Sequence, residues 1–250
     1  MTDPTACVLI IGDEILSGRT QDSNLQFFGE QLAALGIRLK EARVIPDVPK
    51  AIIDTLNEVR AQHTYVFTTG GIGPTHDDIT TDCVAAAFGR KVVRHPAVVA
   101  AMTTYFGTKL NEARLRMANI PEGPHVSLIE NGLSVAPGYR IENVYVMAGV
   151  PSIARAMFEA VAPTLERGAP MFSGSVDASV REGDIAEALS TIQDSYPHVA
   201  IGSYPHMRKD HVGTSIVARS TDKRAIAAAL EEVAAAMRAL GAEPEFGATP

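Results

Sequence analysis

The first 90 residues alternate short apolar segments with segments in which apolar residues recur every three or four positions. Residues 6–11 and 64–69 are almost continuously apolar, which predicts buried strands, and residues 39–45 predict a further strand between them. This alternation favours an α/β architecture, with a mostly parallel sheet covered by helices on both faces. The helical spacing predicts helices around 25–35, 49–59 and 79–87.

The ends of the predicted helices carry capping signals. Ser23 with Gln26 fits a capping box, in which both side chains satisfy backbone groups of the first turn. Asp47 is placed to cap the next helix, and Ser152 is placed to cap a later helix that Pro163 distorts or ends. A purely structural role as a cap is therefore open for Asp47.

The pattern changes near 167–170, where Arg-Gly-Ala-Pro predicts a domain boundary. We expect residues 1–167 to form a ligand-binding unit and residues 168–250 a small accessory domain. The order strand, helix, two strands and helix after the boundary is typical of a two-layer α+β domain of split-βαβ type. The remaining expectations are a helix at 97–117, strands at 126–129, 144–147, 172–180, 199–204 and 212–219, helices at 184–196 and 223–240, and a frayed end at 243–250.

Composition limits the class of protein. With 46% hydrophobic and 20% charged residues and a mean hydropathy of +0.07, the 250-residue chain is typical of a globular protein. No apolar run is long enough to span a membrane, and the first residues lack signal-peptide features, so we expect a cytoplasmic protein. The net charge of −7 and the lack of a basic run argue against nucleic acid as a partner. Cys7 and Cys83 lie in apolar segments and are interpreted as buried hydrophobic residues.

A glycine-rich loop follows the apolar strand at 64–69. Its glycines let backbone N–H groups approach an anion, and the helix that follows points its positive end to the same place. The spacing excludes a Walker A loop and a dinucleotide fingerprint, and a tight turn alone would also use glycines. However, three aspartates within six residues exceed what helix capping requires. We predict a phosphate site formed by Gly70, Gly71, Gly73, Pro74, Thr75, Asp77 and Asp78, with Asp82 close by.

Further polar residues follow other predicted strands. Because the carboxyl ends of parallel strands meet at one edge of a sheet, these residues are expected at the same edge as the loop. For Glu14 the alternative role is that of a solvated surface charge, and for Asp47 it is that of a helix cap. The predicted ligand-binding edge contains Gly12, Asp13, Glu14, Asn24 and Asp47.

Six short segments follow one another along the chain: GDEIL at 12–16, SGRTQDSN at 17–24, IPD at 45–47, TTGGIGPTHDDIT at 68–80, NGLSVAPG at 131–138 and GVPS at 149–152. In this order they resemble the MoaB/Mog-like molybdopterin-binding domain, especially as it occurs in competence/damage-inducible (CinA) proteins. The resemblance extends over about 6–165, and residues 201–205 are similar to the small middle domain of CinA-like proteins.

The resemblance implies a three-layer α/β sandwich and a ligand. In molybdenum-cofactor members the ligand is molybdopterin, and Asp47 and Asp78 match the carboxylates tied to the adenylylation step. In the CinA-like and FAD-synthase-associated branches, the resemblance implies metal-dependent cleavage of dinucleotide diphosphates such as ADP-ribose or FAD. The Gly-Pro-Thr-x-Asp-Asp form of residues 73–78 is similar to that second group.

The resemblance also adds a third segment to the ligand site, consisting of Ala136, Pro137 and Gly138. The chain departs from the family pattern just before it, because Ser134-Val135 replaces the usual Gly-Thr, and Ala148 replaces the usual Pro before Gly149. The first departure bears on the backbone contacts to the ligand, and therefore on its identity.

Three functions are open at this point. One is a diphosphatase whose divalent cation (Mg²⁺, Mn²⁺ or Co²⁺) is held by Asp78 and Asp47, since a cation would offset a carboxylate–phosphate repulsion of about 4 kcal/mol per close pair near a protein surface. Another is a pterin-binding or cofactor-assembly protein, because a pterin donates hydrogen bonds to carboxylates. The third is a ligand-sensing scaffold.

Family resemblance implies a homo-oligomer. The alternative phosphate ligands, interpreted first as solvated helix charges, are Lys109, Arg114 and Arg116.

Overall fold

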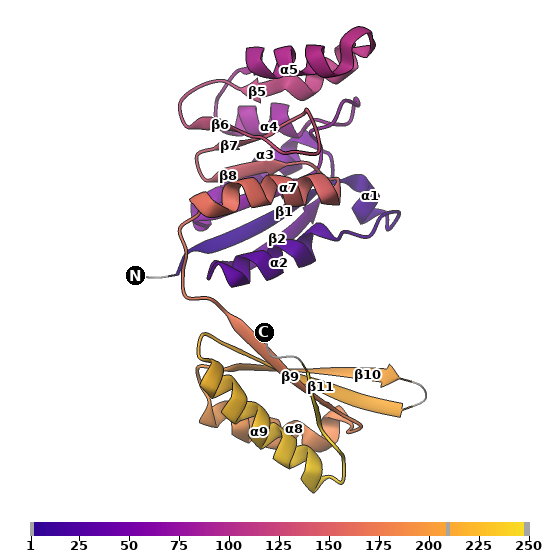
Figure 1. Ribbon diagram of the computed structural model, residues 1–250, viewed down its shortest axis with the longest axis vertical. Helices are drawn as coiled ribbons and strands as arrows, with labels where there is room; N and C mark the ends of the chain where they lie inside the picture. Colours follow the sequence, from indigo (N-terminus) through magenta and orange to yellow (C-terminus); the bar gives the residue numbers. More distant parts are fainter. Residues whose placement is uncertain (1–2, 209–210, 248–250) are drawn as a thin grey trace. The chain divides into compact units, whose positions relative to one another are not determined.

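The computed structural model describes residues 3–208 and 211–247. The chain divides into two compact units, the first extending to Gly168 and the second beginning at Ala169. Figure 1 shows a larger sheet with helices on both faces and a smaller sheet with two helices. The predicted α/β class with a mostly parallel sheet, followed by a small α+β unit, is confirmed.

A six-stranded sheet forms the centre of the first unit. In sheet order, its strands are β2 (Arg38–Ile45), β1 (Thr5–Ile11), β3 (Tyr65–Thr69), β8 (Val144–Met147), β7 (Gly138–Ile141) and β6 (Val126–Ile129). The first four strands pair in parallel, so that β1, β2 and β3 end at the same edge. Strand β7 pairs antiparallel with both β8 and β6, and it is an element that the sequence did not predict.

Two helices cover each face of this sheet. On one face, Phe28 of α2 (Asn24–Ala34) and Phe158 of α7 (Pro151–Val161) pack on Phe67 of β3, with ring centroids 5.4 and 5.6 Å apart respectively. The other face buries apolar side chains of α3 (Pro49–Gln62) and α4 (Thr80–Ala87) against the inward side chains of β1. The result is the expected three-layer sandwich.

The helix expected at 97–117 is broken into shorter elements. It consists of α5 (Pro96–Phe106), η1 (Gly107–Lys109), α6 (Glu112–Leu115) and η2 (Arg116–Ala118). Gly107 ends α5 in a left-handed conformation, with φ +51°, which favours glycine. The flanking strands β4 (Val92–Arg94) and β5 (Asn119–Pro121) form a separate antiparallel pair, while Pro163 lies in η3 (Ala162–Thr164) directly after α7.

Three helix-capping predictions are wrong. At the start of α2 the cap is Asp22, whose Oδ1 accepts a hydrogen bond from the Leu25 amide at 2.8 Å, in place of Ser23. Ser152 lies inside α7, because Pro151 occupies the first helical position. Asp47 makes no capping bond to α3, where Val48 is the N-cap residue. The carboxylate of Asp47 is therefore available for another role.

The second unit has the predicted βαββα order, followed by one further short strand. Its elements are β9 (Phe172–Ala178), α8 (Glu182–Ser195), β10 (Ala200–Arg208), β11 (His211–Ser220), α9 (Lys223–Ala239) and β12 (Glu245–Phe246), with sheet order β10-β11-β9-β12. In the core, apolar residues of α8 and α9, such as Ile185 and Val233, pack against Val176 and Ile216 of the sheet.

The expectation that residues 243–250 fray is wrong for β12, which pairs antiparallel with β9. Residues 248–250 lie outside the described residues.

Within residues 3–208 and 211–247, none of the helices combines the length and the apolar composition that crossing a lipid bilayer requires.

Candidate functional site

The glycine-rich loop begins where β3 ends, at the carboxyl edge of the parallel strands. Gly70 has φ +103°, and a Cβ there would lie 2.1 Å from the carbonyl oxygen of Ile11 in β1. Gly71 has φ +67°, and its Cβ would lie 2.1 Å from Thr80 Oγ1. Both positions therefore require glycine for backbone conformation and for close packing. The Gly71 carbonyl accepts the Thr80 amide at 3.0 Å, which joins the loop to the start of α4.

A tight turn places Asp78 at the end of the loop. One carboxylate oxygen, Oδ2, accepts hydrogen bonds from the Thr75 amide at 2.7 Å and from the Thr75 hydroxyl at 2.5 Å. A Cβ on Gly73 would lie 2.7 Å from the same oxygen, so a side chain at this position would force the Asp78 carboxylate to shift. The other oxygen, Oδ1, accepts no hydrogen bond from the described part of the chain. Asp78 is thus held in place with one oxygen available to a ligand.

Arg116 lies beside this turn. Its guanidinium Nη2 donates to the backbone carbonyl of Asp78 at 3.1 Å. The interpretation of Arg116 as a solvated helix charge is therefore wrong. The pKa of the neighbouring Asp77 is held below its ordinary value, chiefly by the Thr75 side chain, and the positive charge of Arg116 also lowers it. Asp77 therefore carries its negative charge close to the guanidinium of Arg116.

Asp47 joins the loop after β2 to the short helix α1 (Asp13–Leu16), which follows β1. Its Oδ2 accepts a hydrogen bond from the Asp13 amide at 3.0 Å. Burial raises the pKa of Asp47, and the negative charges of Asp13, Glu14 and Asp77 raise it further, although the bond from Asp13 acts in the opposite direction. These carboxylates, from three separate segments, are therefore close enough to repel one another at the carboxyl edge of the sheet.

A small cleft of about 70 Å³ opens next to these carboxylates. Asn24, at the start of α2, is buried in its wall and donates from Nδ2 to the Gly149 carbonyl at 3.0 Å. Its Oδ1 and the hydroxyl of Thr69 are both buried, without hydrogen-bond partners among the described residues. Each is a polar group that a ligand can satisfy, since buried polar atoms in proteins are normally paired. Other lining residues are Glu14, Gln21, Asp22, Gly70 and Pro151.

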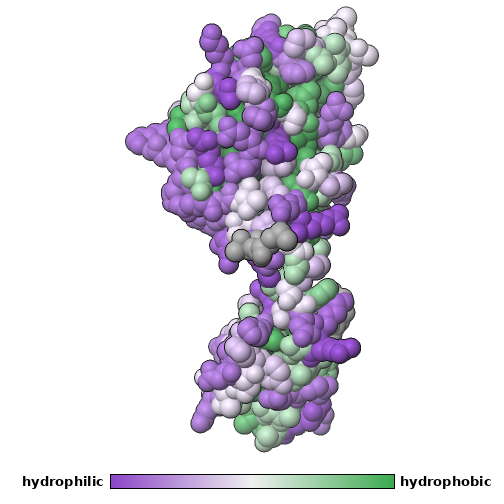
Figure 2. Space-filling model, turned by 90° about the vertical axis from the view of Figure 1, so that its left-hand side faces the viewer, coloured by the Kyte–Doolittle hydropathy of each residue, from purple (hydrophilic) through white to green (hydrophobic). Residues whose placement is uncertain are grey.

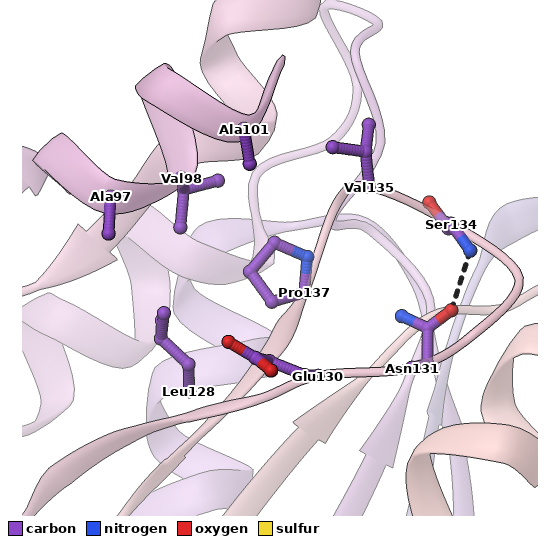
Figure 3. Close-up of a pocket in the computed structure, with 9 residues that line it drawn as sticks. All are labelled: Ala97, Val98, Ala101, Leu128, Glu130, Asn131, Ser134, Val135 and Pro137. Carbon is purple, nitrogen blue, oxygen red and sulfur yellow. Dashed lines mark hydrogen bonds between the residues drawn. The ribbon is translucent and has the colours of Figure 1, made fainter. Parts of the chain in front are cut away.

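The third predicted segment forms a different pocket. Its loop is closed by Asn131, whose Oδ1 accepts the Ser134 amide at 2.7 Å and whose Nδ2 donates to the Ala136 carbonyl. Figure 3 shows Pro137 projecting into a pocket of about 280 Å³ between this loop and α5. Gly138 belongs to β7, where a Cβ would lie 2.4 Å from the Val146 carbonyl oxygen. No hydrogen bond within the described residues joins this loop to the glycine-rich loop.

The predicted site residues therefore lie in two places. Most of them surround the carboxyl edge of β1, β2 and β3, namely Gly12, Asp13, Glu14, Asn24, Asp47 and the residues of the 70–78 loop. Thr69 is a further polar residue there that the sequence reasoning missed, although a polar residue at the end of an apolar strand is a usable signal. Arg116 was named only as an alternative phosphate ligand. Its contact with Asp78 had no signal in the sequence, because 38 residues separate the two.

The comparison with protein families identifies the type of domain that contains this edge. Residues 7–167 match the family described as the probable molybdopterin binding domain. The chain belongs to this family. Residues 170–244 match the model described as the middle domain of FAD synthase. The boundary between the two matches falls at the division near Gly168 and Ala169.

Relatives place this molybdopterin-binding-family chain in the CinA-like branch. A protein of Aeropyrum pernix is 33% identical over 257 residues, covering 95% of each chain. A CinA-like protein of Kosmotoga olearia is 36% identical over 63% of this chain and 40% of its own, and a probable FAD synthase of Caenorhabditis briggsae is 28% identical over 92% and 49%. The chain thus spans about half the length of these two named relatives or less.

The fold also agrees with a solved CinA structure. The crystal structure of the CinA protein of Thermoplasma acidophilum superposes with a TM-score of 0.60 at 30% sequence identity. The match covers 65% of this chain and 98% of that one. The MoaB/Mog-like fold with a CinA-type sequence, inferred from six short segments, is confirmed.

Proposed function

We propose that this protein is a metal-dependent diphosphatase that cleaves a dinucleotide diphosphate of the ADP-ribose or FAD type. The observation that carries the proposal is the group of carboxylates around Asp47. Asp13, Glu14 and Asp77 all raise the pKa of Asp47, and neither Asp13, Glu14 nor Asp47 has an ion-pair partner among the described residues. Like charges kept together without partners are typical of functional sites.

The glycine-rich loop supports a diphosphate as the ligand. Its glycines bring main chain, rather than side chains, to the edge where β1 and β3 end, and backbone N–H groups are suited to phosphate oxygens. Arg116, fixed against the Asp78 carbonyl, adds a positive charge next to the loop. The cleft of about 70 Å³ has room for only a small part of such a ligand. The remainder would lie across the open edge.

The carboxylates suit a divalent cation that is shared with the substrate. No three of them bring oxygens within 4.8 Å of one another in the described part of the chain, so they do not form a closed protein cage. Mg²⁺ is ordinarily held by one or two carboxylates together with substrate phosphates, which agrees with such an open arrangement. We assign Asp78 to this role, with Asp47 assisting the cation or the attacking water. When bound, the cation would neutralise phosphate charge and lower the pKa of the attacking water.

The remaining residues position the reacting groups. In the reaction, a water oxygen forms a bond to one phosphorus atom and the bridging P–O bond breaks, giving two monophosphate products. Asp47 is suited to accept the proton of that water, because burial and its neighbours raise its pKa above that of an ordinary aspartate. Asn24 Oδ1 and the Thr69 hydroxyl would hydrogen-bond the part of the ligand that enters the cleft.

A second candidate function is the binding of a pterin without hydrolysis. The same unpartnered Asn24 Oδ1, next to the carboxylate of Glu14, offers acceptors to the amino and ring N–H groups of a pterin. The family description also names molybdopterin as the ligand of this domain. This function needs no cation, and that difference separates the two candidates.

The experiment incubates the purified protein with ADP-ribose, FAD or NADH, with or without Mg²⁺, Mn²⁺ or Co²⁺, and measures AMP by chromatography. We expect AMP from at least one dinucleotide, only when a cation is present. Absence of AMP under every condition would exclude the diphosphatase. Calorimetric binding of a pterin that is lost in Asp78→Asn would then establish the second candidate.

A further inference from the structure

A second group of metal-ligating side chains lies in the first unit, away from the carboxyl edge. Cys7 of β1, Glu41 of β2 and His63, directly after α3, bring one ligand atom each within 4.8 Å of one another. Cys7 lies near the start of β1, and His63 comes two residues before β3 begins. The group therefore belongs to the amino-terminal half of the strands, whereas the proposed diphosphate site lies where the strands end.

A β-bulge brings two of these residues opposite each other. Ala6 pairs with Leu39, but the register then shifts so that Cys7 pairs with Glu41 rather than with Lys40. Without this shift, Lys40 would stand opposite Cys7 and Glu41 would point to the other face of the sheet, because side chains alternate along a strand. Bulges commonly re-aim a side chain in this way. The bulge thus places the thiol and the carboxylate on the face covered by α3.

Two of the three residues, Glu41 and His63, are anchored by contacts outside the group. Arg43 Nε donates to Glu41 Oε1 at 2.5 Å, while the other oxygen, Oε2, lies 3.3 Å from His63 Nε2. The main chain of His63 is fixed by Asn143, whose Nδ2 donates to its carbonyl at 3.0 Å. Hydrogen-bonded carboxylates and fixed ligand backbones are what metal sites require of their surroundings.

His63 supplies independent evidence for a missing ligand. Its side chain is 8% exposed, and its Nδ1 is buried without a hydrogen-bond partner among the described residues. Buried imidazoles in proteins ordinarily pair both nitrogens, so one nitrogen of this ring has unused bonding capacity. The adjacent Cys7 sulfur is fully buried and forms no disulfide. A cation bound within the group would take one nitrogen of this ring and the Cys7 sulfur.

We propose that Cys7, Glu41 and His63 bind one zinc ion. A thiolate, an imidazole and a carboxylate are the ligand types of zinc in proteins, and its tetrahedral geometry, with bonds of about 2.0–2.3 Å, needs ligand atoms about 3.5 Å apart. Ligand atoms within 4.8 Å reach that spacing through side-chain shifts of about 1 Å. The Cys7 thiol releases its proton to solvent as the Zn–S bond forms.

The position of the group indicates a structural role for the ion. Zinc would tie β1, β2 and the end of α3 together, and a ligand that binds only the folded state stabilises it. Glu41 is partly exposed, with 29% of its side chain accessible. This exposure gives the ion a path from solvent and leaves room for a water molecule as its fourth ligand. Figure 2, which views the side where β1 begins, shows a largely hydrophilic surface.

The test is a Zn²⁺ titration against a chromophoric chelator, with Cys83→Ser as the matched control, since Cys83 is the other buried cysteine. We expect one zinc per chain in wild type and in Cys83→Ser, and a loss of affinity of at least about a hundredfold in Cys7→Ser and in His63→Gln. His95→Gln, which alters another histidine with an unpartnered Nδ1, should bind as wild type does. Binding of less than one zinc per chain by wild type, or unchanged affinity in Cys7→Ser, would overturn the proposal.

A spectroscopic measurement covers the case in which Cys7→Ser does not fold. In Cys83→Ser, Cys7 is the single thiol of the chain. Co²⁺ added to this variant should give the near-ultraviolet charge-transfer absorption of a cobalt–thiolate bond, and Zn²⁺ should displace it. Absence of that absorption contradicts the site, whereas cation binding by carboxylates alone cannot produce it.

Discussion

At the two ends of the parallel sheet in the first unit, the acidic side chains differ in whether they have positively charged partners. At the amino-terminal half, Glu41 and Glu58 both bind the guanidinium of Arg43, at 2.5 and 2.7 Å. At the carboxyl edge, Asp13, Glu14 and Asp47 lie close together without a lysine or arginine partner in the described part of the chain. Paired charges hold a fold together, while unpaired ones keep their charge for a ligand. We therefore expect substitutions at the two ends to have opposite effects on stability and activity.

The largest effect is expected from Asp47→Asn. Asparagine keeps the acceptor for the Asp13 amide but loses the charge, so AMP release should fall by about a hundredfold or more. Because burial and neighbouring carboxylates raise the pKa of Asp47, its charge opposes folding at neutral pH. The melting temperature should consequently change by no more than about 2 °C, and upward if at all.

The matched control is Asp54→Asn on α3, where the carboxylate is exposed and paired with Lys50. Full activity is expected there, because surface pairs of this kind contribute little. An equal loss of activity in both variants would show that the effect of Asp47→Asn does not come from the site.

Substitution of Gly71 should act on binding and on folding together. Alanine at this position needs φ +67° and places its Cβ 2.1 Å from Thr80 Oγ1, so the loop has to move and phosphate affinity should be lost. Gly89 is the matched control, since it has φ +60° with no atom within 4 Å of a Cβ. Gly89→Ala should cost about 1–2 kcal/mol of stability and leave ADP-ribose binding, measured by calorimetry, unchanged.

Arg116→Met should have a smaller effect. It removes the bond to the Asp78 carbonyl and a positive charge next to the loop, so ADP-ribose should bind about tenfold more weakly, a loss of about 1.4 kcal/mol. Arg114→Met serves as control, because its guanidinium bonds to the Lys109 carbonyl and stacks on Phe106 instead. Equal binding by both variants would remove Arg116 from the ligand site.

At the amino-terminal half, Arg43→Met should leave the rate of AMP release unchanged and lower the melting temperature by a few degrees. Hydrogen bonds from Arg43 lower the pKa of Glu58, so this stabilisation is present above the ordinary glutamate pKa of about 4.3 and is lost as the pH falls below it. Thermal unfolding at several pH values should therefore show the two proteins converging in acid. A constant difference would assign the effect to packing instead.

Much of the carboxyl edge could be predicted from the sequence because its signals are local. Buried strands such as β1 and β3 show as apolar runs, and the polar residues that follow them must lie at one edge of a parallel sheet. Strand β7 escaped prediction because it begins with Gly138 and contains the exposed Arg140, so it lacks the apolar pattern of the equally short β8. Its place in the sheet is set by pairing with β8 and not by its own pattern.

Contacts between distant segments could not be predicted from spacing. The bond of Asp47 to the Asp13 amide depends on the register of β1 against β2, and the cap by Asp22 rather than Ser23 depends on the local path of the chain. The group of Cys7, Glu41 and His63 arises from a bulge that no single segment encodes. Such features follow from tertiary structure, which apolar periodicity specifies only in outline.

The most direct test of the difference between the two ends is AMP release from ADP-ribose by wild type, Asp47→Asn and Arg43→Met, each with and without Mg²⁺, together with their melting temperatures. Cation-dependent AMP release that survives Arg43→Met and is lost in a fully folded Asp47→Asn is the predicted result. Cation-independent release, or equal rates in wild type and Asp47→Asn, would contradict the assignment of the unpaired carboxylates to diphosphate chemistry.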